Sequence, residues 1–374
     1  MKGREGQGDR PLLVSVFALL GLGCIAVFSS SDTLSEHYYG SSTAMVLQHM
    51  SKVFVGLVLL VVFARMDYRV FRRLAMPLVL ISMAMLAMTL IPHFPLAISK
   101  KGATRWLDLG FMVVQPAEFA KLSLVVYIAM MLARDGRIRD YKRGFVPVMT
   151  VLATFCLFLI QQPNFGNVLC LSLISCAMLY FGGARFTHLA TSGLATIPLV
   201  AFLALQKPHV IRRFEGFLHP SGDPLGASFQ LRQSLVALGS GGFFGMGPGA
   251  GRQADFFLPD SHTDFVFAIL GEDFGLLGTL VVVALFAILL WRGLVVMREA
   301  SDGFGRYLAC GITAMIGIVA FLNMAVVLGL APTTGLPLPF LSYGGSSMMV
   351  NLGGVGILQS IASRSPVKGR WVVR

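Results

Sequence analysis

The sequence predicts an all-α integral membrane protein, and three observations lead to this prediction. Hydrophobic residues make up 55% of the 374-residue chain and charged residues only 13%, against about 25% charged residues in typical soluble domains. The stretch from Tyr307 to Ser363 contains no Asp, Glu, Lys or Arg over 57 residues. Apolar runs also recur along the whole chain, each close to the ~20 residues that a membrane-spanning helix requires. A single large soluble core would not explain that recurrence.

Ten apolar runs are expected to cross the membrane as helices of one domain, residues 1–374. The uncharged range 144–184 is divided into two spans because Gln161, Pro163 and Gly166 indicate a hairpin inside it. A long extracytoplasmic loop, 207–262, is expected between the seventh and eighth helices, with 1–10 and 364–374 as short ends. The expected spans are 11–31, 45–64, 74–94, 113–133, 144–160, 167–183, 188–206, 263–291, 307–330 and 341–362.

The distribution of basic residues predicts the orientation of these spans. Ten spans place both termini on one side, and the segments on that side hold twenty of the 30 Lys and Arg residues. The opposite side holds eight, and Lys52 and Lys121 lie within expected helices. Because basic loops favour the cytoplasm, both termini are predicted to be cytoplasmic. The net charge of +12 reflects this asymmetry, so nucleic-acid binding is rejected as its cause.

The five cysteines all fall within expected spans, and they form neither a Cys-x-x-Cys motif nor a cluster with histidine. Disulfides and structural zinc are therefore not expected.

Polar residues are concentrated on the outer side, in the loop 95–112 and in the long loop 207–262. Within the long loop, Leu231, Leu235 and Leu238 share one helical face, which predicts a helix lying along the membrane surface. In the fourth span, Glu118 and Lys121 are three residues apart and close enough to pair on a helix. They form either a structural ion pair or a pair that positions a polar ligand.

Asp264 is the strongest candidate for a functional carboxylate, because it begins a long span at the outer end beside His262 and Thr263. No Gly-x-Ser-x-Gly or His-Glu-x-x-His motif accompanies it. The glycine-rich segment 239–251 lacks the Gly-Lys-Ser/Thr ending of a P-loop, so we expect flexible turns there rather than nucleotide binding.

The few basic residues of the outer side are candidates for binding a phosphate or pyrophosphate through forked donors. Some of them would instead contact phospholipid headgroups. Trp106 would either anchor the chain at the membrane interface or stack on a sugar. The basic candidates are Arg105, Arg212, Arg213, Arg232 and Arg252.

Five motifs together resemble the SEDS family (shape, elongation, division and sporulation), in order and over nearly the whole chain. The matching segments are Gly102-Ala-Thr-Arg-Trp-Leu107, Gln115-Pro-Ala-Glu-Phe-Ala-Lys121, Gln233-Ser-Leu-Val-Ala-Leu-Gly-Ser-Gly-Gly242, Leu258-Pro-Asp-Ser-His-Thr-Asp-Phe265 and Leu336-Pro-Leu-Pro-Phe-Leu-Ser-Tyr-Gly-Gly-Ser-Ser347. The segments 233–235 and 332–336 resemble the division members more than the elongation members.

The resemblance implies ten transmembrane helices in the bacterial cytoplasmic membrane and peptidoglycan glycosyltransferase activity on lipid II. It implies a class B penicillin-binding protein as partner, among other divisome or elongasome membrane proteins. The family's essential acid falls on Asp264. Residues expected to bind substrate are Arg105, Trp106, Glu118, Lys121, Arg212, Arg213, Gln230, Arg232, Gln233, Arg252, His262, Ser342 and Gly344.

Three positions depart from the pattern of the family. Lys101 replaces a usual Asn, Asn164 replaces a usual Asp in the hairpin, and Ala254 replaces a basic residue that often follows Gln253. The last change leaves one phosphate contact to be supplied elsewhere. None of the three affects Asp264.

The implied reaction joins the GlcNAc 4-hydroxyl of one lipid II to the MurNAc anomeric carbon of the growing chain and expels polyprenyl pyrophosphate. Asp264 would act as general base or would bind a divalent cation such as Mg²⁺ or Mn²⁺, and the sequence leaves both roles open. The alternatives are an elongation-type polymerase, a lipid II flippase and a scaffold without activity. Polarity concentrated at one face favours an enzyme over a flippase, which needs a polar path through the membrane.

Overall fold

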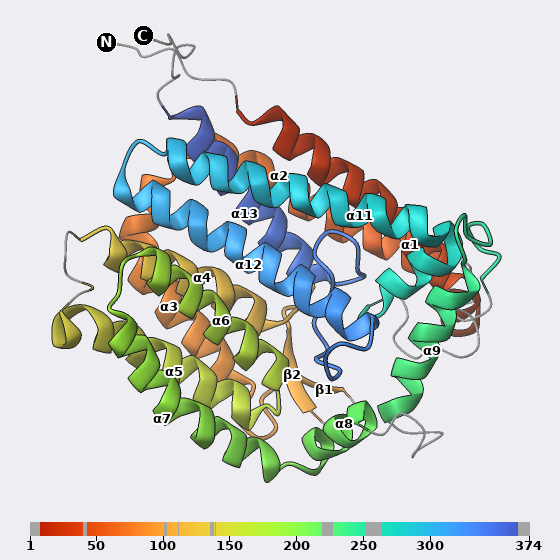
Figure 1. Ribbon diagram of the computed structural model, residues 1–374, viewed down its shortest axis with the longest axis horizontal. Coiled ribbons are helices and arrows are strands. Elements are labelled where there is room, and N and C mark those ends of the chain that lie inside the picture. Colours follow the sequence, from red (N-terminus) through yellow and green to blue (C-terminus); the bar gives the residue numbers. More distant parts are fainter. Residues whose placement is uncertain are drawn as a thin grey trace.

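The computed structural model describes residues 8–39, 43–100, 103–110, 112–134, 138, 140–218, 227–251 and 263–365, and it is mostly helical (Figure 1). Each of the ten ranges expected to span the membrane contains a helix. These helices are α1 (Arg10–Tyr39), α2 (Ala44–Arg65), α3 (Arg69–Met88), α4 (Pro116–Leu132), α5 (Val146–Gln161), α6 (Phe165–Phe181), α7 (Phe186–Leu205), α11 (Val266–Glu299), α12 (Gly303–Val327) and α13 (Gly345–Ser363).

The main differences in helix boundaries occur where charged or polar residues continue an apolar helix. Helix α3 begins at Arg69, five residues before the expected position 74, because basic residues form its first turn. It ends at Met88 rather than at 94, in a turn where His93 has a φ of 58°. Helix α1 continues through polar residues to Tyr39 rather than ending at 31. Apolar composition therefore identifies the membrane segment and not the full helix.

Six helices in the described part of the chain are long and apolar enough to cross a membrane. They comprise residues 10–30 of α1, then α2, α3, the segment Tyr141–Gln161, α11 and α12. The segment Tyr141–Gln161 joins a π-helical turn, η2 (Tyr141–Phe145), to α5. Helix α6 is apolar but shorter, with 17 residues. The chain is therefore an integral membrane protein.

Helices α4, α12 and α13 form the centre of the bundle (Figure 1). Every residue of α13 from Ser346 to Ile361 is buried. Glycines allow α13 to approach α2 closely: a methyl group added to Gly356 would collide with the backbone of Leu60. This close packing explains how a helix containing Asn351 and Gln359 remains in the interior.

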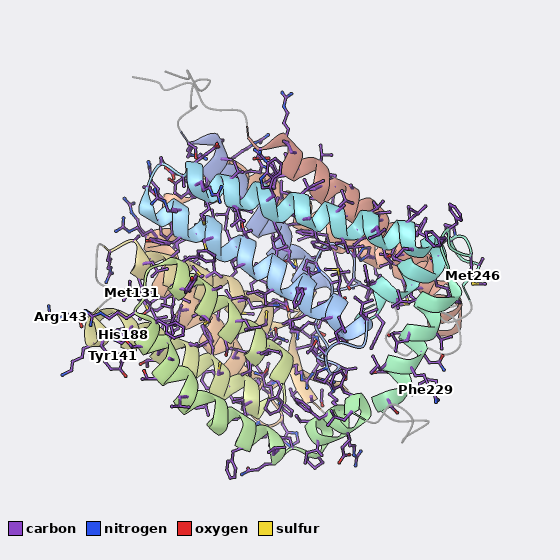
Figure 2. All side chains as sticks on the ribbon, in the orientation of Figure 1. Met131, Tyr141, Arg143, His188, Phe229 and Met246 are labelled. Carbon is purple, nitrogen blue, oxygen red and sulfur yellow. The ribbon has the colours of Figure 1, made fainter. Side chains whose placement is uncertain are left out.

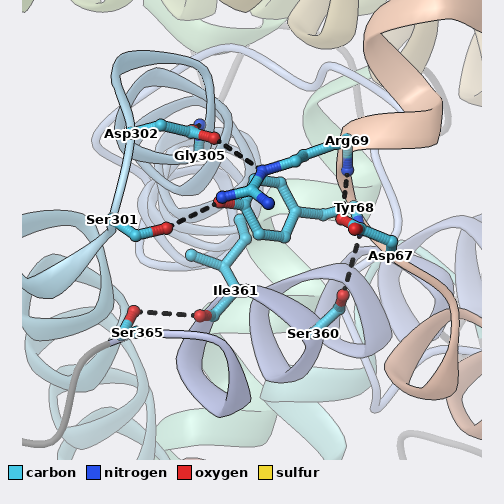
Figure 3. Close-up of polar contacts among 9 residues, drawn as sticks. All are labelled: Asp67, Tyr68, Arg69, Ser301, Asp302, Gly305, Ser360, Ile361 and Ser365. Atoms are coloured by element: carbon cyan, nitrogen blue, oxygen red, sulfur yellow. Dashed lines mark hydrogen bonds and ion pairs between the residues drawn. The ribbon is translucent and has the colours of Figure 1, made fainter. Parts of the chain in front are cut away.

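The ends of several helices are joined by hydrogen bonds at one end of the bundle (Figure 3). The Tyr68 backbone amide donates to Ser360 Oγ at 3.2 Å, and the Tyr68 hydroxyl lies 3.0 Å from Ser301 Oγ. Arg69 Nε donates to Asp302 at 3.0 Å. Segments that the basic-residue count assigned to one side therefore lie together.

The beginning of α1 and the end of α13 meet at the same end of the molecule. Gln359 Nε2 donates to the Asp9 carbonyl at 2.8 Å, and the Asp9 side chain pairs with Arg292 near the end of α11. The first and last helices of the described chain therefore have these termini at the same end of the bundle.

The opposite end is built from shorter elements. The outer segment expected to be a loop instead forms a small antiparallel sheet, β1 (Ala97–Lys100), β2 (Ala103–Asp108) and β3 (Val113–Val114), in the order β1-β2-β3. The class is therefore mainly α with a small sheet. The described parts of the long loop contain α8 (Pro208–Leu218) and α9 (Ala227–Ser240).

Helix α9 confirms the predicted helix in the long loop, although its leucines do not share one environment. Leu231 is buried, whereas Leu235 is exposed. Leu238 packs against Gly271 of α11, where a methyl group would collide with it. The predicted position along the membrane surface remains a prediction.

Helix α11 is broken at Gly275, which has a φ of 65° and a ψ of −160°. The glycine-rich segment after α9 supplies the hydrogen bonds that the break removes. Met246 and Gly247 donate to the carbonyls of Glu272 and Asp273 at 2.9 and 3.0 Å. In the other direction, Leu276 donates to the Gly242 carbonyl at 2.9 Å. These glycines close a helix break, which was not predicted from the sequence.

Helix α7 lies at the edge of the bundle (Figure 1). Its first turns are fixed by aromatic contacts, since His188 lies 5.1 Å from the Tyr141 ring and 5.4 Å from the Phe145 ring. Figure 2 shows Tyr141, Arg143 and His188 at the edge opposite to Phe229 and Met246.

Candidate functional site

Asp264 lies in a cavity of about 160 Å³ at the end of the bundle away from Tyr68 and Asp302. Only Phe265 separates it from Val266, the first residue of α11. From Asp302 to Asn323, α12 rises by about 30 Å, which is the thickness of the hydrocarbon core of a membrane. The cavity is therefore one membrane thickness away from the hydrogen-bonded end of the bundle.

Four walls line the cavity, and two helices together form the first of them. Helices α8 and α9 contribute Arg213 and Gln230, which were both predicted to bind substrate. The segment before α11 contributes Asp264 and Phe265, and α12 contributes Asn323 and Val326. The fourth wall is the polar break between α12 and α13, residues 333–336.

Asn323 fixes the position of two of these walls relative to each other. Its Nδ2 donates to the carbonyl of Asp264 at 2.8 Å and to the carbonyl of Leu336 at 2.7 Å. The side chain is 1% exposed. Because buried carbonyls need donors, this amide holds the Asp264 backbone against the polar break.

The polar break itself is held from several sides. Arg213 donates to the Thr333 carbonyl at 3.1 Å, and Leu338 donates to Ser342 Oγ at 2.8 Å.

Gly335 has a φ of 71°, and a methyl group added there would lie 3.6 Å from Asp264 Oδ2. On the far side, a methyl group at Gly166 of α6 would collide with the Thr334 carbonyl. The glycine at position 335 leaves space next to the carboxylate.

Arg105 belongs to β2 and lies near the cavity, so the small sheet is close to the cavity as well. Its Nε and Nη2 donate to the carbonyls of Gln162 and Pro163 at 2.9 and 2.7 Å, which ties β2 to the turn between α5 and α6. Burial lowers the pKa of the Arg105 guanidinium, the Arg213 cation lowers it further, and the Asp264 carboxylate raises it. Two arginines and one carboxylate therefore act electrostatically on one another here.

Glu118 and Lys121 pair as predicted, but they do not line this cavity. Lys121 Nζ lies 2.7 Å from Glu118 Oε1, and the two side chains are 1–2% exposed. A buried pair of opposite charges with such a short contact is a well-formed ion pair. The structure is consistent with a structural ion pair, and contact with a ligand remains a prediction.

The other predicted residues in the described part of the chain do not belong to the lining of the cavity. Ser342 is buried and supports the polar break through its bond with Leu338, and Gly344 is the N-terminal capping residue of α13. Trp106 of β2 and Gln233 of α9 are partly exposed, whereas Arg212 and Arg232 are exposed. None of these residues lines the cavity, so their substrate contacts remain predictions. Arg252 and His262 lie outside the described residues, as do Lys101 and Ala254.

Asn164, where the family usually has Asp, is 5% exposed and precedes α6. It accepts a hydrogen bond from Asn167 Nδ2 at 3.0 Å. A buried amide needs no counter-charge at this position.

The sequence reasoning missed Asn323 and did not place residues 333–336 beside Asp264. Asn323 lies within the uncharged stretch that begins at Tyr307, and a strongly polar side chain within such a stretch was a usable signal. For the polar break, the sequence indicated hydroxyl groups and backbone without large side chains at one membrane face. The contact of this break with α8 and with the segment before α11 depends on the tertiary fold.

No cluster of three or more His, Cys, Asp or Glu side chains that could hold a metal ion is found among the described residues. Asp264, with its carboxylate, and Gln230, with its side-chain amide, both line the cavity. Mg²⁺ commonly binds one or two carboxylates together with phosphate oxygens of a substrate. These donors fit a cation that arrives with a pyrophosphate.

Comparisons with known proteins agree with the motifs. A protein from Trichlorobacter lovleyi named "Probable peptidoglycan glycosyltransferase FtsW" is 39% identical over 361 residues, covering 96% of this chain and 94% of its own. "Stage V sporulation protein E" of Bacillus subtilis is 35% identical over 366 residues, covering 98% of this chain and all of its own.

Two solved structures share the fold at 25% identity. One belongs to work on "polymerization and crosslinking by a peptidoglycan synthase complex"; it has a TM-score of 0.77 and covers 95% of this chain and 97% of its own. The Rod shape determining protein RodA of Thermus thermophilus has a TM-score of 0.68 and covers 95% of this chain and 96% of its own. The model of the family described as "Cell cycle protein", which comprises FtsW, RodA and SpoVE, matches residues 10–366. The chain therefore belongs to this family of cell cycle proteins, the SEDS family.

Proposed function

We propose that this protein is a peptidoglycan glycosyltransferase that polymerises lipid II at the outer face of the bacterial cytoplasmic membrane during septal wall synthesis. The observation that carries the proposal is a carboxylate, Asp264, in a cavity that also contains Arg213 and lies near Arg105. The names of the FtsW relatives, at 36–39% identity, support the activity and the septal process.

The reaction requires a base and a means of releasing an anion. The oxygen of the GlcNAc 4-hydroxyl forms a bond to the MurNAc anomeric carbon, and its proton passes to the Asp264 carboxylate. The bond between that carbon and the pyrophosphate oxygen breaks, and polyprenyl pyrophosphate leaves with the electron pair. A single displacement of this kind inverts the anomeric centre. A positioned general base contributes typically 10²–10⁴-fold to such a rate.

Arg213 and Arg105 are suited to the leaving group because a pyrophosphate requires cations more than a proton. Each guanidinium has five donors, and only some of these are used by the Thr333, Gln162 and Pro163 carbonyls. The bonds to carbonyls fix the orientation of the remaining donors before the substrate arrives. A divalent cation held by Asp264 and Gln230 would supply further positive charge to the pyrophosphate.

The cavity accommodates the reacting end of the substrate and not the whole of it. Its volume of about 160 Å³ is below the ~300–1,000 Å³ of typical ligand pockets. The polyprenyl chain would remain in the lipid around the bundle. We further propose ten membrane crossings with both termini in the cytoplasm, and a class B penicillin-binding protein as partner, which the structural likeness to a peptidoglycan synthase complex supports.

The function is tested by incubating purified protein with labelled lipid II and separating the products on a gel, with and without a class B penicillin-binding protein and with Mg²⁺, Mn²⁺ or a chelator. Wild type is expected to give glycan ladders. Asp264→Asn is expected to lose about 10²–10⁴-fold in rate, and Glu215→Gln, which removes an exposed carboxylate of α8, is expected to retain activity. No ladder from wild type with any partner or metal would contradict the proposal.

A further inference from the structure

We infer that Asn323 is a substrate-contacting residue whose amide oxygen, Oδ1, accepts a hydrogen bond from the acceptor sugar, at a hydroxyl next to the attacking one. The inference rests on the proposed function, because it assigns a group to the sugar that binds beside Asp264. It assigns to Asn323 a contact beyond the positioning of Asp264.

The orientation of the amide is fixed by its two partners. The carbonyl oxygens of Asp264 and Leu336 lie 2.8 and 2.7 Å from Nδ2, and a carbonyl oxygen accepts but cannot donate. A flipped amide would place its oxygen against both carbonyls. The nitrogen is therefore assigned by chemistry, and the oxygen is the remaining polar atom of the side chain.

That oxygen is buried and has no hydrogen-bond partner among the described residues. Leaving such an acceptor unpaired costs about 1–3 kcal/mol, so a buried amide oxygen without a partner requires an explanation. Asn323 lines the same cavity as Asp264 and Gln230. A ligand in this cavity that carries a hydrogen-bond donor would satisfy the oxygen.

The chemistry of an acceptor sugar supplies such a donor. The attacking 4-hydroxyl of GlcNAc has one proton, which goes to the Asp264 carboxylate and is not available to a second acceptor. The neighbouring 3- and 6-hydroxyls each carry a proton of their own. Because Nδ2 holds the Asp264 backbone, a contact between Oδ1 and one of these hydroxyls would set the sugar relative to the base.

The test is a coupling experiment between the side chain and the substrate. Lipid II and its analogues lacking the 3- or the 6-hydroxyl of GlcNAc are given to wild type, Asn323→Ala and Asn323→Ser. Wild type is expected to lose about three- to tenfold in kcat/KM with one deoxy analogue, as for a neutral hydrogen bond. Asn323→Ala is expected to be slower with natural lipid II but to show no further loss with that analogue.

A merely structural role would give a different pattern. If the loss with the deoxy analogue is the same in wild type and both Asn323 variants, the effects are additive and the inference is overturned. Wild type that uses both analogues as well as natural lipid II overturns it too, even if the variants do not fold. Absence of ladders from wild type with natural lipid II would overturn the proposed polymerase itself.

Thr313→Val serves as the matched control in the same helix. Thr313 is also a buried polar residue of α12, 4% exposed and with no partner for Oγ1 among the described residues. It lies ten residues, about 15 Å, from Asn323 along the helix. This variant is expected to keep the wild-type loss with the deoxy analogue.

Discussion

At the scale of single residues, Gly335 is restricted both by its backbone and by its neighbour. Its φ of 71° is a conformation that side chains rarely adopt, and it lies beside Asp264 Oδ2. Gly183 provides a comparison, because its φ of 77° is similar but nothing lies within 4 Å of the position a methyl group would occupy. A comparison of the two glycines therefore distinguishes the effect of backbone strain from the effect of a side chain placed beside Asp264.

We expect Gly335→Ala and Gly183→Ala to lose similar stability, about 1–3 kcal/mol, since each forces a non-glycine residue into the left-handed region. Only Gly335→Ala is expected to lose polymerase activity, on the order of tenfold to 10²-fold, because its methyl group would occupy space beside the Asp264 carboxylate that the sugar needs, and a misplacement of the sugar by about 1 Å has effects of that size. Thermal unfolding in detergent and the lipid II assay measure the two quantities. Equal activity in both variants would contradict a requirement for open space beside Asp264.

The buried pair of Glu118 and Lys121 allows a test between its two possible roles. Glu118→Leu alone leaves the Lys121 charge buried without its partner, which costs about 3–5 kcal/mol. Glu118→Leu combined with Lys121→Met replaces the pair with apolar side chains and is expected to recover most of that stability. The free energies of unfolding of the single and double variants measure this recovery.

Activity of the double variant then distinguishes the roles. A stable and active double variant indicates a structural ion pair. A stable but inactive one indicates that the pair contacts or positions a ligand. Destabilisation of the double variant equal to the sum of the single losses would contradict the pairing energetics.

At the scale of elements, the break in α11 depends on glycines in a distant segment. A methyl group at Gly245 would collide with the Asp273 carbonyl, whereas nothing lies within 4 Å of such a group at Gly247. Both glycines have positive φ, 84° and 98°. The segment can therefore approach the broken helix only where a side chain is missing.

Gly245→Ala is expected to destabilise the protein more than Gly247→Ala, by about 1–3 kcal/mol, because it adds overpacking to the same backbone strain. It is also expected to reduce polymerase activity, since it displaces the short part of α11 between Asp264 and the break at Gly275. Thermal unfolding and lipid II polymerisation of both variants provide the measurements. Identical behaviour of the two variants would show that the contact with Asp273 has no energetic importance.

Apolar runs were enough to predict a helix in every expected span, because uncharged stretches such as 307–330 have few other stable states in lipid. The break at Gly275 was not predicted, because the chain is helical on both sides of it and the missing bonds are supplied by Gly242 and Met246, which are distant in the sequence. The small sheet was missed because its strands are short and close to Lys100 and Lys101. In the site, Asp264 was predicted from position and motif, whereas Asn323 required the tertiary contact with Leu336.

At the scale of the whole molecule, the two ends of the bundle differ in character. One end is held together by hydrogen bonds and ion pairs between helix termini, including Tyr68 with Ser360 and Arg69 with Asp302. The other contains the cavity, the sheet and the described parts of the long loop. The proposed polymerisation of lipid II at the outer face of the membrane places the second end outward.

This orientation predicts opposite labelling of two introduced cysteines. Glu215→Cys on α8 is expected to react with a membrane-impermeant maleimide in intact spheroplasts, because Glu215 is exposed at the cavity end. Arg72→Cys in the first turn of α3 is also exposed but is expected to react only after permeabilisation. Labelling of Arg72→Cys from outside would reverse the proposed topology.

The break in α11 also affects how motions of the membrane-spanning helix reach Asp264. An unbroken helix transmits bending and tilting along its hydrogen-bond ladder. A continuous helix of 34 residues would therefore transmit motions of its membrane-spanning part to its first turn. At Gly275 the ladder stops, and the nine helical residues before it are hydrogen-bonded to the glycine-rich segment that follows α9. The carboxylate of Asp264 thus precedes a short helical unit that is coupled to the long membrane segment through the hydrogen bonds of the glycine-rich segment rather than through a continuous helical ladder.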